Sequence, residues 1–447
     1  MPEEQATTET AQGNPSKGFF IAMLTRDISL SDCILDLLDN CVDGINRKVR
    51  TNGAMTDTNN KYSGFWVTVK FDPNTFSISD NCGGISLDAA KNYAFRFGKP
   101  EDVIQDPGQP IGLYGIGMKR AMFKMGKAIK VVSSTGEDSF ELDLVVDDWR
   151  KQPEADWTFK LSNVRRNATD VEVGTTISIT ELHPSVGREF GTPGFSISST
   201  RAIKRDYAFI LQHGLIVKVN DKAVHGTMPT FRESGEVAPL RVRRSEGEVE
   251  VEITGGLSAS PPEDDSPEHR FPEAESYGWY VVCNDRVVVT ADRTNVTGWG
   301  VGSVPAWHPQ FYGFLGVAHF RSSKPQLLPW RTTKRDVDPS NELYKKALVL
   351  MCEAAKTFTD YTNRRKTELK KARGLESAAP VKPISAVGFS NVMKLPAVAR
   401  TTMRRISYEK PATEVEAVAR ALRLRSVSAK EVGIRTFDYF VEREVEK

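Results

Sequence analysis

Three polar side chains, Asp36, Asn40 and Asp43, lie within an otherwise mostly apolar segment, residues 34–45. At about 3.6 residues per helical turn, their offsets of four and seven place all three on one helix face. Polar rows on helices are commonly solvated faces. The row therefore indicates a site only if the rest of the chain supplies partners for it.

Three further segments could supply those partners. The stretch "SISDNCGGIS" places Asp80 at a strand end before a Gly-Gly pair, which alone is typical of a tight turn. The stretch "GLYGIGMK" has Gly112, Gly115 and Gly117 before a helix, where backbone N–H groups can approach a phosphate. It matches neither the Walker A nor the Rossmann pattern. A Gly-Thr pair opens the strand-like segment 174–179, and each signal is weak by itself.

Taken in order and with their spacing, the four segments resemble the GHKL ATPase superfamily, which has the Bergerat fold. The resemblance covers about residues 18–185, and "DLLDNCVDGI" and "YGIGMKRAMFKMG" look closest to its MORC branch. It implies an α+β protein with three parts. These are an N-terminal Bergerat-type α/β sandwich, a transducer (S5-like) α/β domain and a helical C-terminal tail. It also implies that ATP and Mg²⁺ are bound.

The resemblance implies a role for each motif. Asn40 would bind Mg²⁺, Asp80 would accept a hydrogen bond from the adenine amino group, and Gly84 would let the backbone pass close to the base. Thr175, in preference to Thr176, would reinforce the Asp80 end, and residues 98–118 would form a mobile lid. The full set of expected nucleotide-binding residues is Asn40, Asp43, Asp80, Gly84, Ile85, Gly112, Leu113, Tyr114, Gly115, Ile116, Gly117, Met118, Lys119, Thr175 and Thr176.

Two residues are the candidates for catalysis. Lys334, in "LLPWRTTKRDVD", looks like the transducer lysine that reaches the γ-phosphate in related proteins, where it would stabilise the transferring phosphoryl group. The family's catalytic glutamate is Asp36 here, one methylene shorter, so we expect slow hydrolysis. A second departure is Cys82, which occupies the first glycine position of the family's D-x-G-x-G motif.

Two classes of function stay open from the sequence. One is an ATPase whose nucleotide state gates dimerisation or a conformational change, in a DNA-associated or defence role. The other is a nucleotide-gated interaction protein that binds ATP with little or no turnover.

The chain divides into six expected segments. They are a disordered tail over 1–17, the ATPase domain over 18–190, the transducer domain over 195–345, a basic helix over 346–373, a linker over 374–410 and a helical segment over 411–447. Capping boxes at Thr413/Glu416 and Ser428/Glu431 predict the starts of the last two helices.

Composition is that of an ordinary globular protein, with 39% apolar and 26% charged residues. No apolar run reaches the roughly 20 residues of a membrane helix. Five scattered cysteines and no secretory signal favour a cytoplasmic protein. Residues 364–447 carry 19 Lys and Arg against 10 Asp and Glu, a net +9, which leaves −7 for residues 1–363. This basic region is typical either of a solvated helical surface or of contact with nucleic acid or a protein partner.

Overall fold

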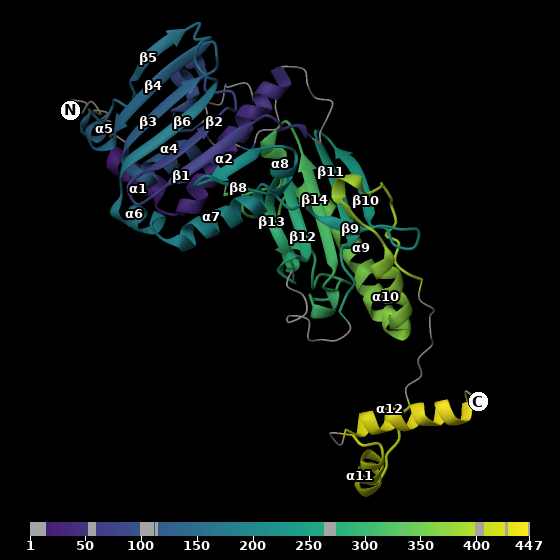
Figure 1. Cartoon of the computed structure of the whole chain (residues 1–447). Coiled ribbons are helices and arrows are strands. Elements are labelled where there is room, and N and C mark those ends of the chain that lie inside the picture. The colour runs from purple at the N-terminus through teal and green to yellow at the C-terminus, as the bar shows by residue number, and fades with distance from the viewer. Residues whose placement is uncertain are drawn as a thin grey trace, which may run out of the picture. The chain divides into compact units, whose positions relative to one another are not determined.

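The computed structural model describes residues 15–51, 60–98, 111, 115–262, 274–331, 333–397, 406–424 and 428–445. The chain forms two compact units, Met1–Val398 and Ala399–Lys447. The first unit contains two large sheets, each with its own helices (Figure 1). The second unit is a pair of helices.

The first sheet has the order β5-β4-β3-β6-β2-β1-β7-β8. Its pairs are antiparallel except β1 with β7. Apolar side chains alternate along the strands, so Val67, Val69, Phe76 and Ile78 point into the core. The strands are β1 (Trp66–Phe71), β2 (Phe76–Asp80), β3 (Gly126–Ser134), β4 (Asp138–Val145), β5 (Leu161–Arg166), β6 (Gly174–Leu182), β7 (Ile216–Val219) and β8 (Lys222–Val224).

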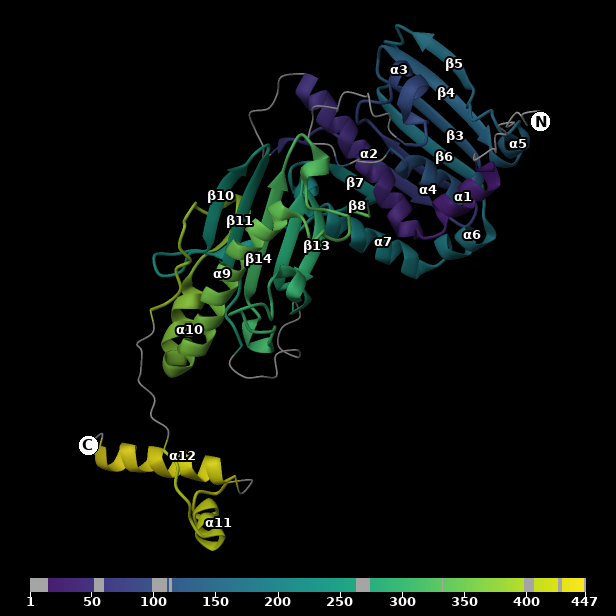
Figure 2. The ribbon, with the colours of Figure 1, turned by 180° about the vertical axis from the view of Figure 1, so that it is seen from behind.

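Helices cover one face of this sheet, as the front and back views both show (Figures 1 and 2). The central helix α2 buries Ile34, Leu38 and Ile45 against the sheet. The helices of this layer are α1 (Lys17–Thr25), α2 (Leu30–Thr51), α3 (Leu87–Ala89), the π-helical turn Ala90–Ala94, α4 (Gly117–Met125) and α5 (Val146–Lys151). The α+β class expected from the sequence is confirmed.

The first sheet extends beyond residue 190, where the sequence suggested that the ATPase domain ends. After α6 (Pro184–Phe190), α7 (Pro193–Asp206) and α8 (Ala208–Gln212), the chain returns to this sheet as β7 and β8. β7 pairs with β1 in parallel, which requires a long crossover of this kind. The apolar pattern of "LIVKVN" shows a strand but not which sheet receives it.

The second sheet has the order β10-β11-β14-β12-β13. Its strands are β10 (Leu240–Glu246), β11 (Val249–Leu257), β12 (Gly278–Cys283), β13 (Arg286–Asp292) and β14 (Phe314–Arg321). The long helix α9 (Glu342–Arg364) packs on β11 and β14 through its apolar stripe, which includes Tyr344, Met351 and Phe358. Asn341 caps its first turn by accepting from the Tyr344 N–H.

A buried polar cluster joins the two sheets. The Tyr62 hydroxyl, at the start of the first sheet, donates to Asp285 Oδ2 over 3.2 Å. Asp285 lies in the turn between β12 and β13, and His319 Nε2 of β14 lies 3.1 Å from its Oδ1. Arg321 Nη2 lies 2.7 Å from His319 Nδ1. Because these groups are buried and hydrogen-bonded to one another, they favour one particular arrangement of the two sheets, which apolar packing alone would specify less well.

Residues 374–397, expected as part of a linker, are instead packed on the second sheet's domain. α10 (Leu369–Ala378) places Glu376 against Arg365, with a 2.8 Å ion pair in which both side chains are buried. The strand β15 (Val381–Pro383) then pairs with β9 (Thr230–Arg232). The Ala/Pro/Ser composition of this stretch hid buried apolar residues such as Ile384 and Met393.

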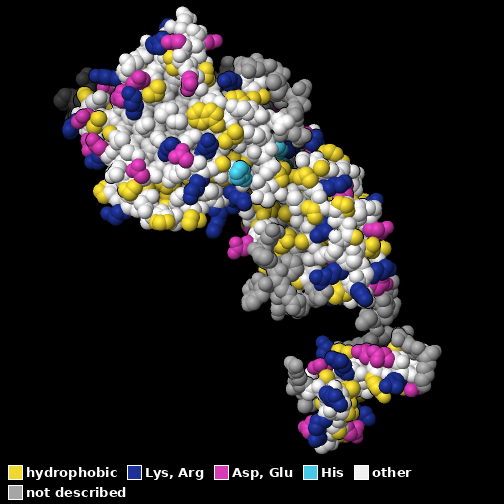
Figure 3. All heavy atoms as spheres, viewed as in Figure 1, with side chains coloured by type: hydrophobic (Ala, Val, Ile, Leu, Met, Phe, Trp, Pro, Cys, Tyr) yellow, Lys and Arg dark blue, Asp and Glu magenta, His cyan; other side chains and the backbone are white. Residues whose placement is uncertain are grey.

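The second unit contains α11 (Ala412–Ala421) and α12 (Ala429–Phe440), the latter continuing as a π-helical turn to Val445. The Ser428 hydroxyl accepts from the Glu431 N–H, as its capping box predicted. α11 begins at Ala412 after Pro411 rather than after Thr413, because Pro suits a helix start without a side-chain cap. Phe437 and Phe440 are exposed, and the surface of this unit mixes apolar and charged side chains (Figure 3). Within the described ranges, no helix is long and apolar enough to cross a membrane.

Candidate functional site

The polar row predicted on α2 is present, and its three members have different surroundings. Asn40 is exposed, and its amide has no hydrogen-bond partner among the described residues. Asp43 is buried, and its Oδ1 accepts a 2.5 Å hydrogen bond from the backbone N–H of Ile111. Asp36 is half-buried and ion-paired. Asn40 therefore presents its amide to solvent, as a ligand for an incoming ion must.

Asp36 is enclosed by α4. Arg120 Nη2 lies 2.5 Å from Asp36 Oδ2, and a Cβ added to Gly117 would lie 3.3 Å from the same oxygen. A close, partly desolvated arginine–carboxylate pair is a strong one. The sequence did not predict Arg120, because nothing in the local pattern of "MKRAMFKMG" relates it to a carboxylate far upstream.

The expected lid falls largely on residues outside the described ranges. Those include 99–110 and three predicted phosphate contacts, Gly112, Leu113 and Tyr114. After them, Gly115 has φ +65° and Ile116 precedes the first turn of α4, in which Met118 is buried. Lys119 is also buried, and its ammonium donates to the backbone oxygens of Ala94, at 2.8 Å, and Gly115. Lys119 thus holds the backbone at the start of α4, and its contact with a nucleotide stays a prediction.

Asp80 ends β2 beside α2. Its Oδ1 accepts a 2.7 Å hydrogen bond from the Cys82 N–H, and its Oδ2 accepts one of 3.3 Å from the Cys41 thiol. Burial raises the pKa of Asp80 above its ordinary value, although these hydrogen bonds oppose the rise. Cys41 follows Asn40 in the chain, so Asp80 meets the same helix that carries the polar row.

The two candidate threonines of β6 have different partners. Thr175 pairs in register with Asp80, and its hydroxyl lies 2.9 Å from that of Ser133. Ser133 also accepts a 2.8 Å hydrogen bond from the Ile85 N–H. Thr176 instead donates to the Ser79 hydroxyl, on the opposite face of the sheet. This geometry favours Thr175 and adds Ser133, which carries no motif of its own and is identified only by strand register.

The Gly-Gly turn explains why Cys82 is tolerated. Gly83 and Gly84 have φ +108° and +71°, a region that favours glycine, whereas Cys82 does not. A Cβ on Gly84 would lie 2.0 Å from the backbone oxygen of Ser134. A Cβ on Gly44 of α2 would lie 2.4 Å from the Cys82 oxygen. The close approach at position 82 is thus made possible by glycine on the helix.

Lys334 comes from the second sheet's domain and contacts α2. Its Nζ lies 2.7 Å from Asp39 Oδ2. The other oxygen, Oδ1, accepts from the Tyr207 hydroxyl and lies 3.3 Å from Arg286 Nε. Burial alone would raise the pKa of Asp39, but the charges of Lys334 and Arg286 hold it below its ordinary value. The sequence predicted Lys334, and Asp39 only as an alternative base to Asp36, but not that these two residues pair.

The loop that carries Lys334 is held at two points on α2. The backbone bridge between Trp330 and Val337 closes this loop, and Lys334 has φ +55°. That conformation costs a residue with a side chain about 1–2 kcal/mol. The next residue, Arg335, pairs with Asp32. Asp32 and Asp39 are seven residues apart, so α2 presents a second acidic row, toward the loop that carries Lys334, beside the row that contains Asn40.

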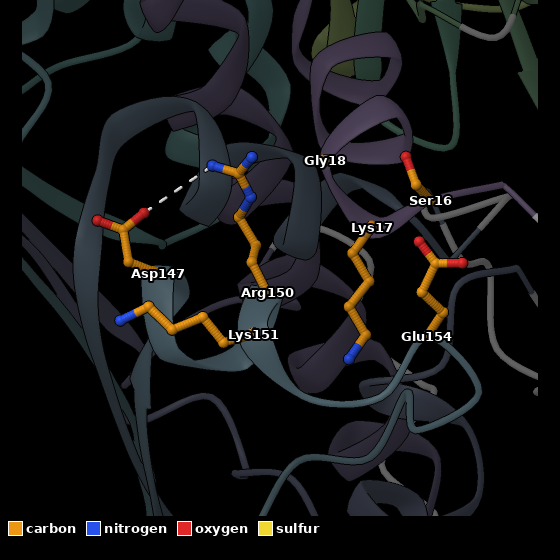
Figure 4. Close-up of a pocket in the computed structure, with 7 residues that line it drawn as sticks. All are labelled: Ser16, Lys17, Gly18, Asp147, Arg150, Lys151 and Glu154. Carbon is orange, nitrogen blue, oxygen red and sulfur yellow. Dashed lines mark ion pairs between the residues drawn. The ribbon is translucent and has the colours of Figure 1, made fainter.

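A surface pocket of about 540 Å³ lies at α1 and α5, away from these motifs (Figure 4). Its cations are already engaged. Lys17 donates to the backbone oxygens of Trp149 and Gln152, and Arg150 pairs with Asp147 at 3.9 Å. The residues that line it are Ser16, Lys17, Gly18, Asp147, Arg150, Lys151 and Glu154. None of them is a predicted nucleotide contact.

Comparison with known proteins gives one family. Residues 28–173 match the sequence model of the histidine kinase-, DNA gyrase B- and HSP90-like ATPases. No curated protein matches the chain. The matched range begins just before α2 and ends just before β6, so it contains the polar row, the Asp80 turn and the glycine lid. Residues 28–173 of this chain therefore have the sequence features of the GHKL superfamily.

Proposed function

We propose that the chain binds ATP together with Mg²⁺ on the exposed face of α2, and that the nucleotide state controls a rearrangement between its two sheets. The supporting observation is that two described residues in the C-terminal half of the expected lid contact the polar row. Ile111 is bonded to Asp43, and Gly117 lies against Asp36. A lid anchored in this way would close over the face that carries Asn40.

The residues fit a magnesium–nucleotide complex. Asn40 offers one exposed oxygen ligand, and Mg²⁺ usually takes one or two protein oxygens and completes its octahedron with phosphates and water. In the described part of the chain, no group of three or more His, Cys, Asp or Glu side chains could hold a metal by itself. When bound, the ion would neutralise phosphate charge.

Adenine would be recognised by the polar cluster at the ends of β2 and β6. Asp80 is the acceptor for the amino group, supported by Thr175 and Ser133. The arrangement is selective because a buried acceptor left unpaired by the wrong base costs about 1–3 kcal/mol.

Two candidate functions remain, and they differ in whether the bound ATP is hydrolysed. In the first, Asp36 acts as the general base and Lys334 contacts the γ-phosphate, which gives a slow ATPase. In the second, the protein binds ATP as a gated interaction module with little turnover. The ion pair between Asp36 and Arg120 favours the second, because it occupies one of the two carboxylate oxygens that a general base could turn toward water.

Affinity and turnover measured side by side separate the two. Binding of ATP and of a non-hydrolysable analogue is measured with and without Mg²⁺, and phosphate release is measured on the same protein. Binding with measurable phosphate release, abolished in Asp36→Ala, supports the ATPase. Binding without release supports the module. Absence of Mg-dependent binding contradicts both.

We further propose that ATP drives dimerisation, with an interface that involves the lid and the N-terminal segment, as in related families. α1 exposes Phe19 and Met23, while Phe20 packs on Phe97 and Trp157 of its own domain. Light scattering of the full chain with and without analogue tests this. The exposed Phe437 and Phe440 would add a contact independent of nucleotide, which Phe437→Ser with Phe440→Ser would remove. A chain that is monomeric in every condition contradicts the proposal.

The partner on which such a switch acts would be bound by another part of the chain, outside the nucleotide site. The basic C-terminal region is the candidate surface for nucleic acid or a protein partner, and a MORC-like, DNA-associated or defence role in the cytoplasm is the setting that we propose. Binding of a mixed-sequence DNA duplex at two salt concentrations is the direct test, because phosphate contacts weaken steeply with salt.

A further inference from the structure

Asp39 lies next to Asn40 in the chain and holds the ammonium group of Lys334. We infer that Asp39 competes with the γ-phosphate for Lys334, and thereby sets how strongly the site distinguishes a nucleoside triphosphate from a diphosphate. This inference rests on the proposed function, because it assumes that Asn40 and Lys334 serve one nucleotide.

The geometry separates the two partners of Lys334. Successive residues of an α-helix project about 100° apart, so Asp39 and Asn40 face different sides of α2. The Asp39 side chain is 2% exposed and points into the junction with the second sheet, whereas Asn40 is exposed. A phosphate bound through Mg²⁺ at Asn40 would thus lie on a different side of the helix from the Asp39 carboxylate. The Lys334 ammonium has to leave Asp39 to reach it.

The charges around Asp39 make this exchange feasible. Arg286 Nη1 lies 3.2 Å from Asp206 Oδ2, so the buried cluster contains two carboxylates and two cations. When Lys334 leaves, Asp39 keeps the Tyr207 hydroxyl and the nearby Arg286 guanidinium. The carboxylate would therefore not be stranded without a partner, which is the most costly outcome for a buried charge.

The same charges explain the selectivity. A triphosphate brings a γ-phosphate, which offers several anionic oxygens to the ammonium. A diphosphate has no group in that position and leaves the Lys334–Asp39 pair intact. Triphosphate binding therefore includes the cost of breaking the pair, and diphosphate binding does not. Removing the charge of Asp39 should lower that cost for the triphosphate alone.

Few contacts would hold the loop that carries Lys334 in place after the ammonium group is released. Lys334 has φ +55°, and its N–H donates to the Arg331 oxygen at 2.9 Å in the turn that presents the side chain. Once the ammonium is released, the pair between Arg335 and Asp32 is the one ion pair among the described residues that still ties this loop to the acidic row. That pair is partly exposed, with 35% and 28% of the two side chains accessible, so it resists movement weakly.

The test is the ratio of the dissociation constant for ADP to that for a non-hydrolysable triphosphate, measured by calorimetry in Mg²⁺ on the full chain. Asp39→Asn keeps an oxygen for Tyr207 and Arg286 but removes the charge that holds Lys334. We expect the ratio to rise about tenfold in this variant. It should fall in Lys334→Met, and the double variant should match Lys334→Met.

The matched control is Arg335→Gln, which loosens the same loop on the same helix without touching Lys334. It should leave the ratio within about twofold of wild type. An unchanged or lowered ratio in Asp39→Asn, or a ratio that rises equally in Arg335→Gln, overturns the inference. Failure of wild type to bind either nucleotide would instead contradict the proposed function, because the ratio could not then be formed.

A second measurement uses the wild-type protein alone, so it does not require that the Asp39→Asn variant folds. Hydrogen exchange of wild type is followed at the amides of Arg331 and Lys334, which are bonded within the loop to Asp336 and Arg331. The triphosphate should accelerate exchange there and ADP should not. Equal exchange with both nucleotides overturns the inference even if Asp39→Asn cannot be purified.

Discussion

Arg120 and Asp36 are 84 positions apart in the chain, yet Arg120 Nη2 lies 2.5 Å from Asp36 Oδ2. The pair joins α4, which follows the lid, to the helix that carries the polar row. It also occupies one of the two oxygens that a general base could turn toward water. The spacing that identifies Asp36 as the candidate base therefore does not reveal what restrains it.

Arg120→Ser should raise the rate of phosphate release about tenfold while leaving nucleotide affinity within a few-fold. The reason is that both oxygens of the freed carboxylate can turn toward the attacking water, and general-base catalysis is worth about 10²–10⁴ in rate when fully effective. Lys124→Gln, one turn further along α4, is the control, because Lys124 donates to the Thr25 backbone oxygen rather than to Asp36. A rate that falls in Arg120→Ser would instead make Arg120 part of the phosphate site.

Asp80→Asn should weaken ATP binding by about 1–3 kcal/mol, because an amide can present a donor where the adenine amino group needs an acceptor. Thr175→Val and Thr176→Val form a matched pair on one strand. The first should weaken binding through Ser133 and Asp80, and the second should leave it nearly unchanged. Calorimetric titration checks all three, and equal losses in the two threonine variants would remove Thr175 from the site.

Gly84→Ala should destabilise the fold by about 3 kcal/mol or more, because its Cβ would overlap the Ser134 oxygen at 2.0 Å and the residue has φ +71°. Gly64→Ala separates the two causes, since Gly64 has φ +85° but no atom near its added Cβ. That variant should lose only about 1–2 kcal/mol. Urea denaturation measures both, and similar losses would show that the contact with Ser134 is unimportant.

Acid should destabilise the junction between the sheets through His319. Burial, and then the guanidinium of Arg321, lower the pKa of His319 to about 4, against the opposing effect of Asp285. The unfolded chain therefore binds the proton first, so stability is complete above about pH 6.5 and falls between there and about pH 4, by up to about 3 kcal/mol.

Equilibrium unfolding of wild type at several pH values checks this, with His319→Gln as the comparison. The variant should be less stable at neutral pH and should lack the loss over that window. A wild-type curve that is flat from pH 7 to pH 4.5 would contradict the assignment.

Much of the fold follows from periodicity in the sequence. The apolar alternation of β1, β2, β3 and β6 and the 3.6-residue pattern of α2 predict those elements, and the order of four motifs predicts the family of residues 28–173. Periodicity reports the surface that an element buries, but not its neighbour. That is why the expected range 195–345 put β7 and β8 with the second domain although they belong to the first sheet, and why residues 374–397 appeared to be part of a linker.

The site divides in the same way. Asn40, Asp80 and Lys334 belong to sequence motifs and can be identified from them. The residues that they contact in space can be identified only from the tertiary structure. No sequence pattern relates Asp39 to Lys334, whereas burial and three donors distinguish Asp39 in the structure. Ser133 is identified only by its register opposite Thr175. Contacts between segments that are distant in the chain produce no recognisable pattern of residue spacing in the sequence.

The pairing of Arg365 with Glu376 has a practical consequence for how the chain can be divided. A chain shortened to Arg373 would keep the long helix α9 but leave a buried guanidinium without its carboxylate, and would expose the apolar surface that β15 and Met393 cover. A shortened chain is therefore expected to keep the fold of the first unit only if it extends to about residue 397. Tags, fusions and truncations intended to isolate the first unit belong beyond that point.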